Sequence, residues 1–135
     1  MAGKLRYLPI TGRLATWRAR KVVTYIESNL SATILVAVLA RIAGVSCSSF
    51  HRAFRSRFGV TPHVYVTAKR VEFAQVLMLT TNESLSQISL ACGMTDQAHF
   101  TRIFRRLTGK TPGRWRTQQY QQAPRDAPHN FTHSV

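Results

Sequence analysis

Apolar residues recur along the chain at the spacing of amphipathic helices rather than of strands. From Thr16 onward they fall every three to four residues, as at Val22, Ile26 and Leu30, and this period predicts a helix with one buried face. We expect seven helices, covering approximately residues 16–30, 34–43, 47–58, 62–80, 84–92, 97–107 and 112–118. The pattern therefore predicts an all-α fold.

Capping residues indicate where these helices begin and end. Ser46 precedes the third helix, and Ser84-x-x-Gln87 is the pattern of a capping box before the fifth. Either Thr95 or Asp96 is expected to cap the sixth helix. Thr-Pro pairs at 61–62 and 111–112 place a capping residue before a proline at the first helical position. Glycines at 44, 59, 93 and 109 predict the ends of the preceding helices.

The helices divide into two similar halves. We expect an irregular N-terminal arm over residues 1–15, a first helix-turn-helix subdomain over 16–60, a linker helix over 61–80 and a second helix-turn-helix subdomain over 81–118. Residues 119–135 are polar and contain two prolines, which predicts a disordered tail.

One basic, aromatic segment occurs twice, fifty positions apart. FHRAFRSRFGVTP (50–62) and FTRIFRRLTGKTP (100–112) share Phe, Arg, Phe, Arg, Gly, Thr and Pro at the same offsets. Each copy follows an apolar helix, a glycine and a turn of three or four residues, which is the order of a helix-turn-helix unit. The glycine suits a turn in which the chain leaves the first helix with positive φ.

Helical projection separates a buried face from an outward face in both copies. The predicted core face comprises Phe50, Ala53, Phe54 and Phe58 in the first copy and Phe100, Ile103, Phe104 and Leu107 in the second. The outward face comprises Ser48, Arg52 and Arg55 in the first copy and Ala98, Arg102 and Arg105 in the second. The flanks of this face hold Ser49, His51 and Ser56 in the first copy and His99 and Thr101 in the second. Trp17 and Trp115 are also predicted core residues. An outward face of this composition suits a helix in the major groove, where arginine can bind guanine with two hydrogen bonds.

The charge of the chain indicates its class of partner. Nineteen lysines and arginines against five acidic residues give a net charge of +14, an excess that usually means a nucleic-acid partner. The acidic residues are dispersed singly, and neither a phosphate-binding glycine loop nor a nucleophile elbow occurs. We therefore expect no enzymatic activity, no cofactor and no metal site, including at His129 and His133.

Two further features bear on setting and geometry. Cys47 and Cys92 do not form a CxxC pair, and nothing before them reads as a signal peptide, which favours a reduced cytoplasmic location. No apolar run approaches the ~20 residues needed to span a bilayer. A linker helix from Pro62 to Thr80 would span ~28 Å at about 1.5 Å per residue. That length approaches the ~34 Å between successive major-groove faces of B-DNA, so one chain could read two neighbouring turns.

The segment LARIAGVSCSSFHRAFRSRFGVTPHVYVTAKRVEFAQVLMLTTNESLSQISLACGMTDQAHFTRIFRRLTGKTPGRWR resembles the DNA-binding domain of the AraC/XylS family of bacterial transcription regulators. The resemblance covers roughly residues 17–117 and is most specific from Ser84 through Trp115. It implies two helix-turn-helix subdomains that bind double-stranded promoter DNA, most often as an activator that recruits RNA polymerase. Because about fifteen residues precede the first helix, the chain resembles the short, stand-alone MarA/SoxS/Rob type; a fragment of a longer regulator is the alternative. We accordingly expect a monomer on DNA, in the cytoplasm and associated with the nucleoid.

Site residues follow from this resemblance by position. Base readout is assigned to Ser48, Ser49, His51 and Arg52 in the first recognition helix and to Gln97, Ala98, His99 and Arg102 in the second. Phosphate contacts are assigned to Arg55, Lys69, Arg105 and Arg116. Ala98 cannot hydrogen-bond to a base as a polar side chain would, and its methyl group can only contact a thymine methyl. Ser89 stands where the family usually has alanine, which predicts slightly looser packing.

Three alternatives remain open at the level of sequence. The arginine-rich faces could be solvated helix surfaces, although two copies after two helix-turn signatures argue against this. A basic protein that coats nucleic acid without reading it would show no sequence preference. An adaptor for acidic protein surfaces would be indifferent to changes at Arg52 and Arg102.

Overall fold

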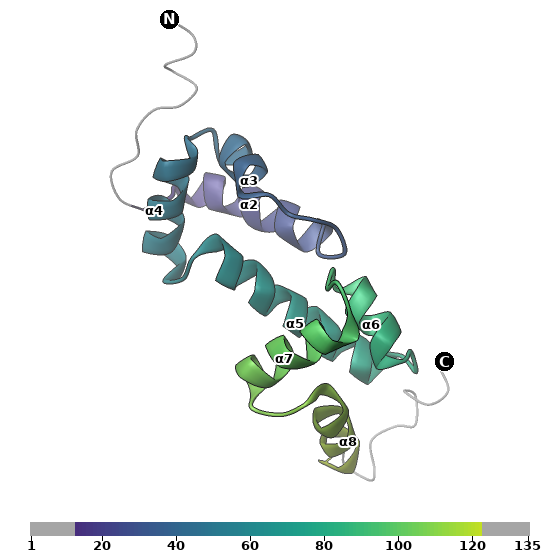
Figure 1. The fold of residues 1–135 in the computed structure, drawn as a ribbon. Coiled ribbons are helices and arrows are strands. Elements are labelled where there is room, and N and C mark those ends of the chain that lie inside the picture. The colour runs from purple at the N-terminus through teal and green to yellow at the C-terminus, as the bar shows by residue number, and fades with distance from the viewer. Residues whose placement is uncertain (1–12, 123–135) are drawn as a thin grey trace, which may run out of the picture. The chain divides into compact units, whose positions relative to one another are not determined.

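The computed structural model describes residues 13–122, which form seven α-helices and no strand (Figure 1). The helices are α2 (Thr16–Ser28), α3 (Val36–Ala43), α4 (Cys47–Phe58), α5 (Pro62–Thr80), α6 (Leu85–Ala91), α7 (Gln97–Thr108) and α8 (Pro112–Gln122). The all-α prediction is confirmed. Most of the predicted arm, most of the predicted tail and both His129 and His133 lie outside the described residues.

The predicted caps are present at the predicted positions. Ser46 Oγ accepts a hydrogen bond from the Ser49 amide at 3.3 Å. Ser84 and Gln87 form a reciprocal capping box with both bonds at 3.1 Å. Asp96, rather than Thr95, caps α7, with its Oδ1 2.7 Å from the His99 amide nitrogen. Local signals therefore fix these helix starts.

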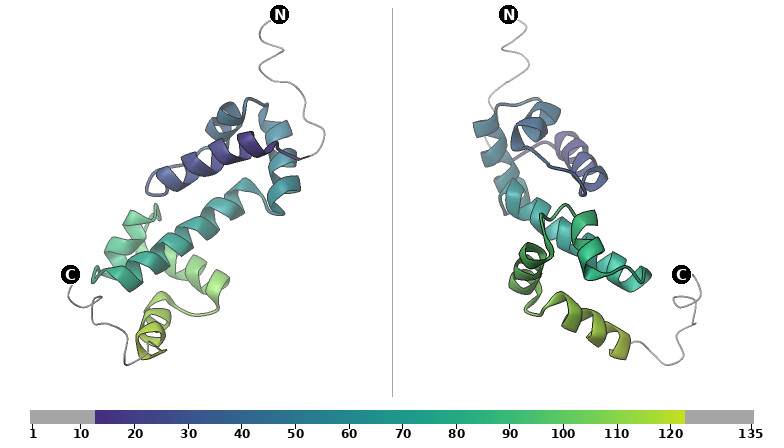
Figure 2. Two further views of the ribbon diagram at one scale, coloured as in Figure 1. Left: turned by 180° about the vertical axis from the view of Figure 1, so that it is seen from behind. Right: turned by 45° about the vertical axis from the view of Figure 1, so that its right-hand side comes forward.

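The chain divides into two compact units, Met1–Lys69 and Arg70–Val135, and each has its own core. In the first unit α3 packs against both α2 and α4, and in the second α7 packs against both α6 and α8 (Figure 2). The linker helix is shared rather than separate, because Val66 of α5 joins the first core while Val71, Ala74 and Met78 join the second.

Phenylalanines from the repeated segment form the centre of each core. Phe50 and Phe54 of α4 are fully buried, with ring centroids 5.5 Å apart. Phe100 and Phe104 of α7 are equally buried and 5.7 Å apart. Trp115 of α8 is half-buried and meets Phe104 edge-on at 5.8 Å. The core prediction for these four phenylalanines is confirmed, and each contributes about 1.5–3 kcal/mol through burial.

The end of the N-terminal arm also takes part in the first core. Leu14 is 1% exposed, and its amide donates to the Ala53 carbonyl at 3.4 Å. Arg57 of α4 donates from Nη1 to the Leu14 carbonyl at 3.3 Å. The residues just before α2 are therefore irregular in backbone but fixed against α4.

Two predicted core residues are instead exposed. Trp17 is 55% exposed, because it lies about 200° around α2 from the buried Ala19. The guanidinium of Arg18 lies 4.4 Å from its ring centroid. Leu107 is 45% exposed, since it lies in the last turn of α7 beyond the buried Phe104.

The last described helix is longer than the sequence indicates. Helix α8 continues to Gln122, whereas we expected disorder from residue 119. The Tyr120 hydroxyl donates to the Met78 carbonyl at 2.9 Å, a tertiary contact that stabilises this extra turn. Within residues 13–122, no helix is long and apolar enough to cross a membrane.

Candidate nucleic-acid interface

Helices α4 and α7 are built alike, each within its own unit. Both contain twelve residues, begin after a residue whose side chain accepts an amide hydrogen bond, and end at a glycine with positive φ. That angle is 78° at Gly59 and 81° at Gly109, values that favour glycine. Each helix is therefore a defined segment with a buried phenylalanine face and an opposite face free to bind a partner.

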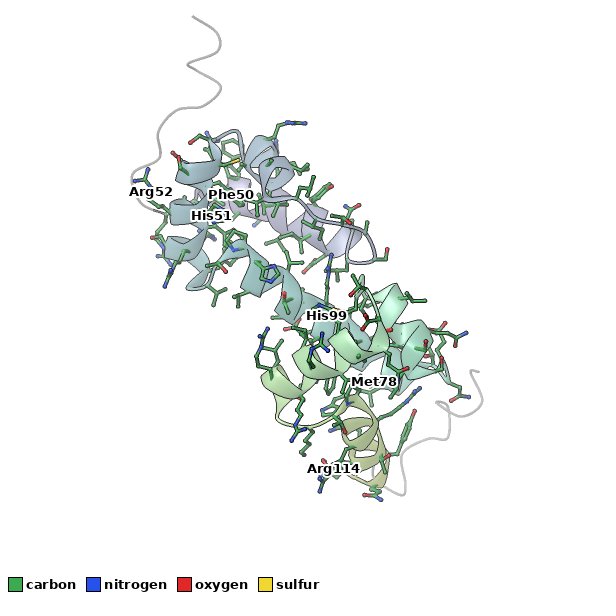
Figure 3. The ribbon with its side chains drawn as sticks, viewed as in Figure 1. Phe50, His51, Arg52, Met78, His99 and Arg114 are labelled. Atoms are coloured by element: carbon green, nitrogen blue, oxygen red, sulfur yellow. The ribbon has the colours of Figure 1, made fainter. Side chains whose placement is uncertain are left out.

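The outward face of α4 presents most of its predicted readers. Ser48, His51 and Arg52 are exposed, as is Arg55 one turn further along. Figure 3 shows Arg52 extending outward from α4, while Phe50 lies toward the interior of the unit. These side chains offer hydrogen-bond donors and acceptors along one helix surface.

Ser49, one of the predicted readers, is less accessible than the sequence indicates. Its side chain is only 6% exposed, whereas we expected it on the flank of the outward face. Ser49 precedes the buried Ala53 by about one helical turn, so both residues lie on the buried face of α4. Its backbone amide serves the cap by donating to Ser46.

Helix α7 presents the corresponding surface in the second unit. Gln97, Ala98, Arg102 and Arg105 are exposed. His99, labelled in Figure 3, is half-buried, and its backbone amide donates to the Asp96 carboxylate in the first turn. Four of the five predicted residues on this helix thus lie fully on the solvent side.

The other two predicted phosphate contacts are half-buried. Lys69 lies on α5 with its ammonium 5.5 Å from the ring centroid of Tyr65. Arg116 donates from Nε to the Met78 carbonyl at 3.0 Å, from Nη1 to Glu83 at 2.8 Å and from Nη2 to Thr81 at 2.6 Å. Arg116 thus serves the end of α5, a role that its sequence pattern did not indicate.

Arginines separate into two groups by exposure. Arg52, Arg55, Arg102 and Arg105 are exposed, whereas Arg18, Arg57, Arg70 and Arg116 are half-buried and each donates to at least one backbone carbonyl. We call the second set the inward arginines. The four exposed arginines present their guanidinium groups to solvent, where an external polyanion can reach them.

Cys92 adjoins one inward arginine at the turn of the second unit. Burial raises the pKa of the Cys92 thiol to about 11, an effect that the nearby charge of Arg70 partly opposes. Burial likewise lowers the pKa of Arg70. Cys47, at the first residue of α4, is exposed.

Sequence reasoning passed over three further cations beside α7. Arg106, Lys110 and Arg114 are exposed at its end, in the following turn and in the first turn of α8. All three lie within nine positions, 106–114, at the end of the repeated segment and just after it. This clustering is visible in the sequence and could have identified them. The residues described contain no group of three or more metal-binding side chains.

Known proteins share this arrangement. Residues 39–118 match a family described as a helix-turn-helix domain. The probable transcriptional regulator LumQ of Photobacterium leiognathi is 41% identical over 91 residues, covering 67% of this chain and 37% of LumQ. The transcriptional activator NphR of a Rhodococcus species is 34% identical over 99 residues, covering 73% of this chain and 29% of NphR. The chain thus spans less than half the length of these curated relatives.

Solved structures agree with the sequence relatives. The DNA-binding domain of AdpA, a global transcriptional factor solved in complex with a target DNA, is 30% identical with a TM-score of 0.74, covering 80% of this chain and 96% of that one. An AraC-type regulator from Chromobacterium violaceum is 29% identical with a TM-score of 0.73, covering 78% and 95%. The chain therefore belongs to the AraC/XylS family of transcription regulators and carries its two-unit helix-turn-helix domain.

Proposed function

We propose that the chain is a sequence-specific, double-stranded DNA-binding regulator in which α4 and α7 each enter a major groove. The observation that carries this proposal is the matched pair of helices α4 and α7, each with buried phenylalanines and two exposed arginines three positions apart. A protein that only coated nucleic acid would need positive charge but not two capped helices of equal length. The relative AdpA, whose domain was solved with a target DNA, supports this partner.

Base reading falls on the exposed residues of the two helices. In α4 these are Ser48, His51 and Arg52, and in α7 they are Gln97, Ala98 and Arg102. Arginine can donate two hydrogen bonds to guanine, glutamine can pair with adenine and the Ala98 methyl can contact thymine. His99 is a weaker candidate because it is half-buried.

Phosphate binding falls on exposed cations around these readers. Arg55 and Arg105 follow Arg52 and Arg102 by less than one turn, and Lys110 and Arg114 extend the positive surface of the second unit. Such contacts position the protein and make affinity fall with salt. Lys69 and Arg116 stay predicted contacts of lower accessibility.

The regulator acts as a monomer on an asymmetric site of two boxes. Helix α5 has nineteen residues, which corresponds to ~28 Å, and it connects two complete helix-turn-helix units in one chain. We further propose that it works in the cytoplasm on the nucleoid as an activator that recruits RNA polymerase, as several relatives are named activators.

Selection of the purified protein against random double-stranded DNA at ~150 mM salt tests the proposal, because non-specific contacts weaken at that salt. We expect enrichment of a site with two short boxes about one helical turn apart. If no sequence is enriched while binding still declines steeply with salt, the protein coats nucleic acid and the regulator proposal fails. Tight binding to polymerase subunits that ignores changes at Arg52 and Arg102 would instead indicate an adaptor.

A further inference from the structure

In each unit the turn between the two helices of the helix-turn-helix accepts a hydrogen bond from an arginine. The arginine lies on the helix that comes before the helix-turn-helix, α2 in the first unit and α5 in the second. In the first unit Arg18 of α2 donates from Nη1 to the Ala43 carbonyl. In the second unit Arg70 of α5 donates from Nη1 to the Gly93 carbonyl at 3.3 Å. The two arginines come from dissimilar sequence contexts, so the repeat in the sequence does not reveal them.

The two acceptor carbonyls occupy equivalent places relative to the recognition helices. Ala43 lies four residues before Cys47, the first residue of α4, and Gly93 lies four residues before Gln97, the first residue of α7. The acceptors are therefore fifty positions apart, the same interval that separates Phe50 from Phe100. Relative to the positive-φ glycine the acceptors differ by one position, since Ala43 precedes Gly44 whereas Gly93 is that glycine itself. Two units with different donors thus each hold a turn carbonyl four residues before the recognition helix.

Both turns have the same backbone geometry at their glycine. Gly44 and Gly93 each have φ of 73°. The amides of Val45 and Met94 return to the carbonyls of Ala40 and Ser89, both at 3.0 Å. This pattern satisfies carbonyls inside the final turn of α3 or α6. The Ala43 carbonyl, at the end of α3, and the Gly93 carbonyl, just beyond the end of α6, each accept from an arginine instead.

A guanidinium is well suited to supply that donor. It brings a positive charge to the negative end of the helix dipole as well as an N–H group. Arg18 and Arg70 are both half-buried, so their hydrogen bonds are partly shielded from water. Their stems start on α2 and α5, which contribute Val22, Ile26, Ala74 and Met78 to the two cores. The bond therefore fixes the turn to an element that is itself packed.

We propose that Arg18 and Arg70 are positioning residues that hold the turn of their own unit and thereby set how α4 and α7 are presented to DNA. The inference rests on the proposed function, since it concerns the presentation of those helices. Neither guanidinium reads a base or neutralises a phosphate in this role. Each acts only on the unit to which it belongs.

Hydrogen exchange on the free full-length chain tests the structural half of the proposal. Arg18→Met and Arg70→Met keep an unbranched apolar stem and remove the guanidinium, and Arg114→Met is the matched control at an exposed site. We expect amides of residues 44–50 in the first variant, and of residues 93–100 in the second, to exchange about tenfold faster. The other unit and the Arg114→Met variant should match the parent chain.

DNA binding to sites altered in one box tests the functional half. Each methionine variant should lose discrimination about tenfold at the box read by its own unit and keep it at the other box. On random DNA its affinity and salt slope should be unchanged, because no phosphate contact is removed. Arg105→Met, at a predicted phosphate contact, should instead lower the salt slope on random DNA by about one.

Lysine variants separate positioning from a loss of folding. Arg18→Lys and Arg70→Lys keep the charge but not the forked donor, so they should fall between the parent and the methionine variants in both measurements. Equal losses at both boxes and on random DNA, or unchanged exchange in the turns, would overturn the proposal. If the parent chain selects no site, the proposed function fails, whereas the exchange experiment still decides whether these arginines hold the turns.

Discussion

At the scale of single residues, arginines with the same side chain have different environments in this chain. Arg102 is exposed on α7, whereas Arg116 on α8 gives three hydrogen bonds to carbonyls. A sequence pattern places both on basic helices and cannot distinguish them, because the acceptors lie more than thirty positions away. Ser49 was misplaced for a related reason, since helical projection locates the edge of a buried face only to within one residue.

Loss of a base contact and loss of a phosphate contact should weaken DNA binding in different ways. Arg102→Ala should weaken binding to the selected site by ~1–3 kcal/mol and relax specificity at one base pair. Arg55→Ala should weaken all sequences about equally and lower the salt slope by about one. Titrations of selected and random DNA across a range of salt concentrations measure both. Equal losses on selected and random DNA for Arg102→Ala would remove its assignment as a base reader.

The two cysteines predict a difference in reactivity and a pH dependence. At pH 8 the exposed Cys47 should react with a thiol reagent in the native chain while the buried Cys92 stays protected.

The folded pKa of Cys92, about 11, lies above that of an unfolded thiol. The folded state therefore holds its proton more tightly, and this contribution to stability is complete below about pH 8.5 and is lost as pH rises toward 11.

Urea unfolding at pH 8 and pH 10.5 measures this linkage. Cys92→Ala removes the thiol and is the control for every other effect of pH on unfolding. The decline in the free energy of unfolding should be smaller in Cys92→Ala than in the parent chain. An identical decline in both would show that Cys92 makes no contribution.

At the scale of elements, helix starts were predictable because their signals are local. Ser46, Ser84 with Gln87, and Asp96 each act on an amide three residues away. Helix ends that depend on distant partners were not predictable. The extra turn of α8 needs the bond from Tyr120 to Met78, which are forty-two positions apart.

Arg116 should be important for the stability of the second unit. Its guanidinium binds the carbonyls of Met78, Thr81 and Glu83, where α5 ends without a glycine cap. Arg116→Met should lower the free energy of unfolding by roughly 2–3 kcal/mol, since charged hydrogen bonds contribute about 1.5–3 kcal/mol each but this group is only half-buried. Arg114→Met, two positions away and exposed, should change it by less than about 0.5 kcal/mol. Equal values for the two variants in urea unfolding would contradict this role.

At the scale of the whole molecule, the two separate cores predict separable stability. The buried residues of one cluster do not recur in the other, although α5 contributes to both. Phe54→Ala and Phe104→Ala should each cost about 3–5 kcal/mol. Hydrogen exchange should rise mainly in the unit that contains the substitution. A uniform rise across residues 13–122 in both variants would show that the units unfold as one.

The equal construction of α4 and α7 has a consequence for engineering. Both begin after a side-chain cap, contain twelve residues and end at a left-handed glycine followed two positions later by Thr-Pro. The boundaries of an exchangeable cassette therefore already exist in the chain. Grafting the exposed residues of α7 onto α4, while leaving its caps and phenylalanines in place, should give a protein that recognises two copies of one box. Designed promoters could then carry the same box twice instead of two different boxes.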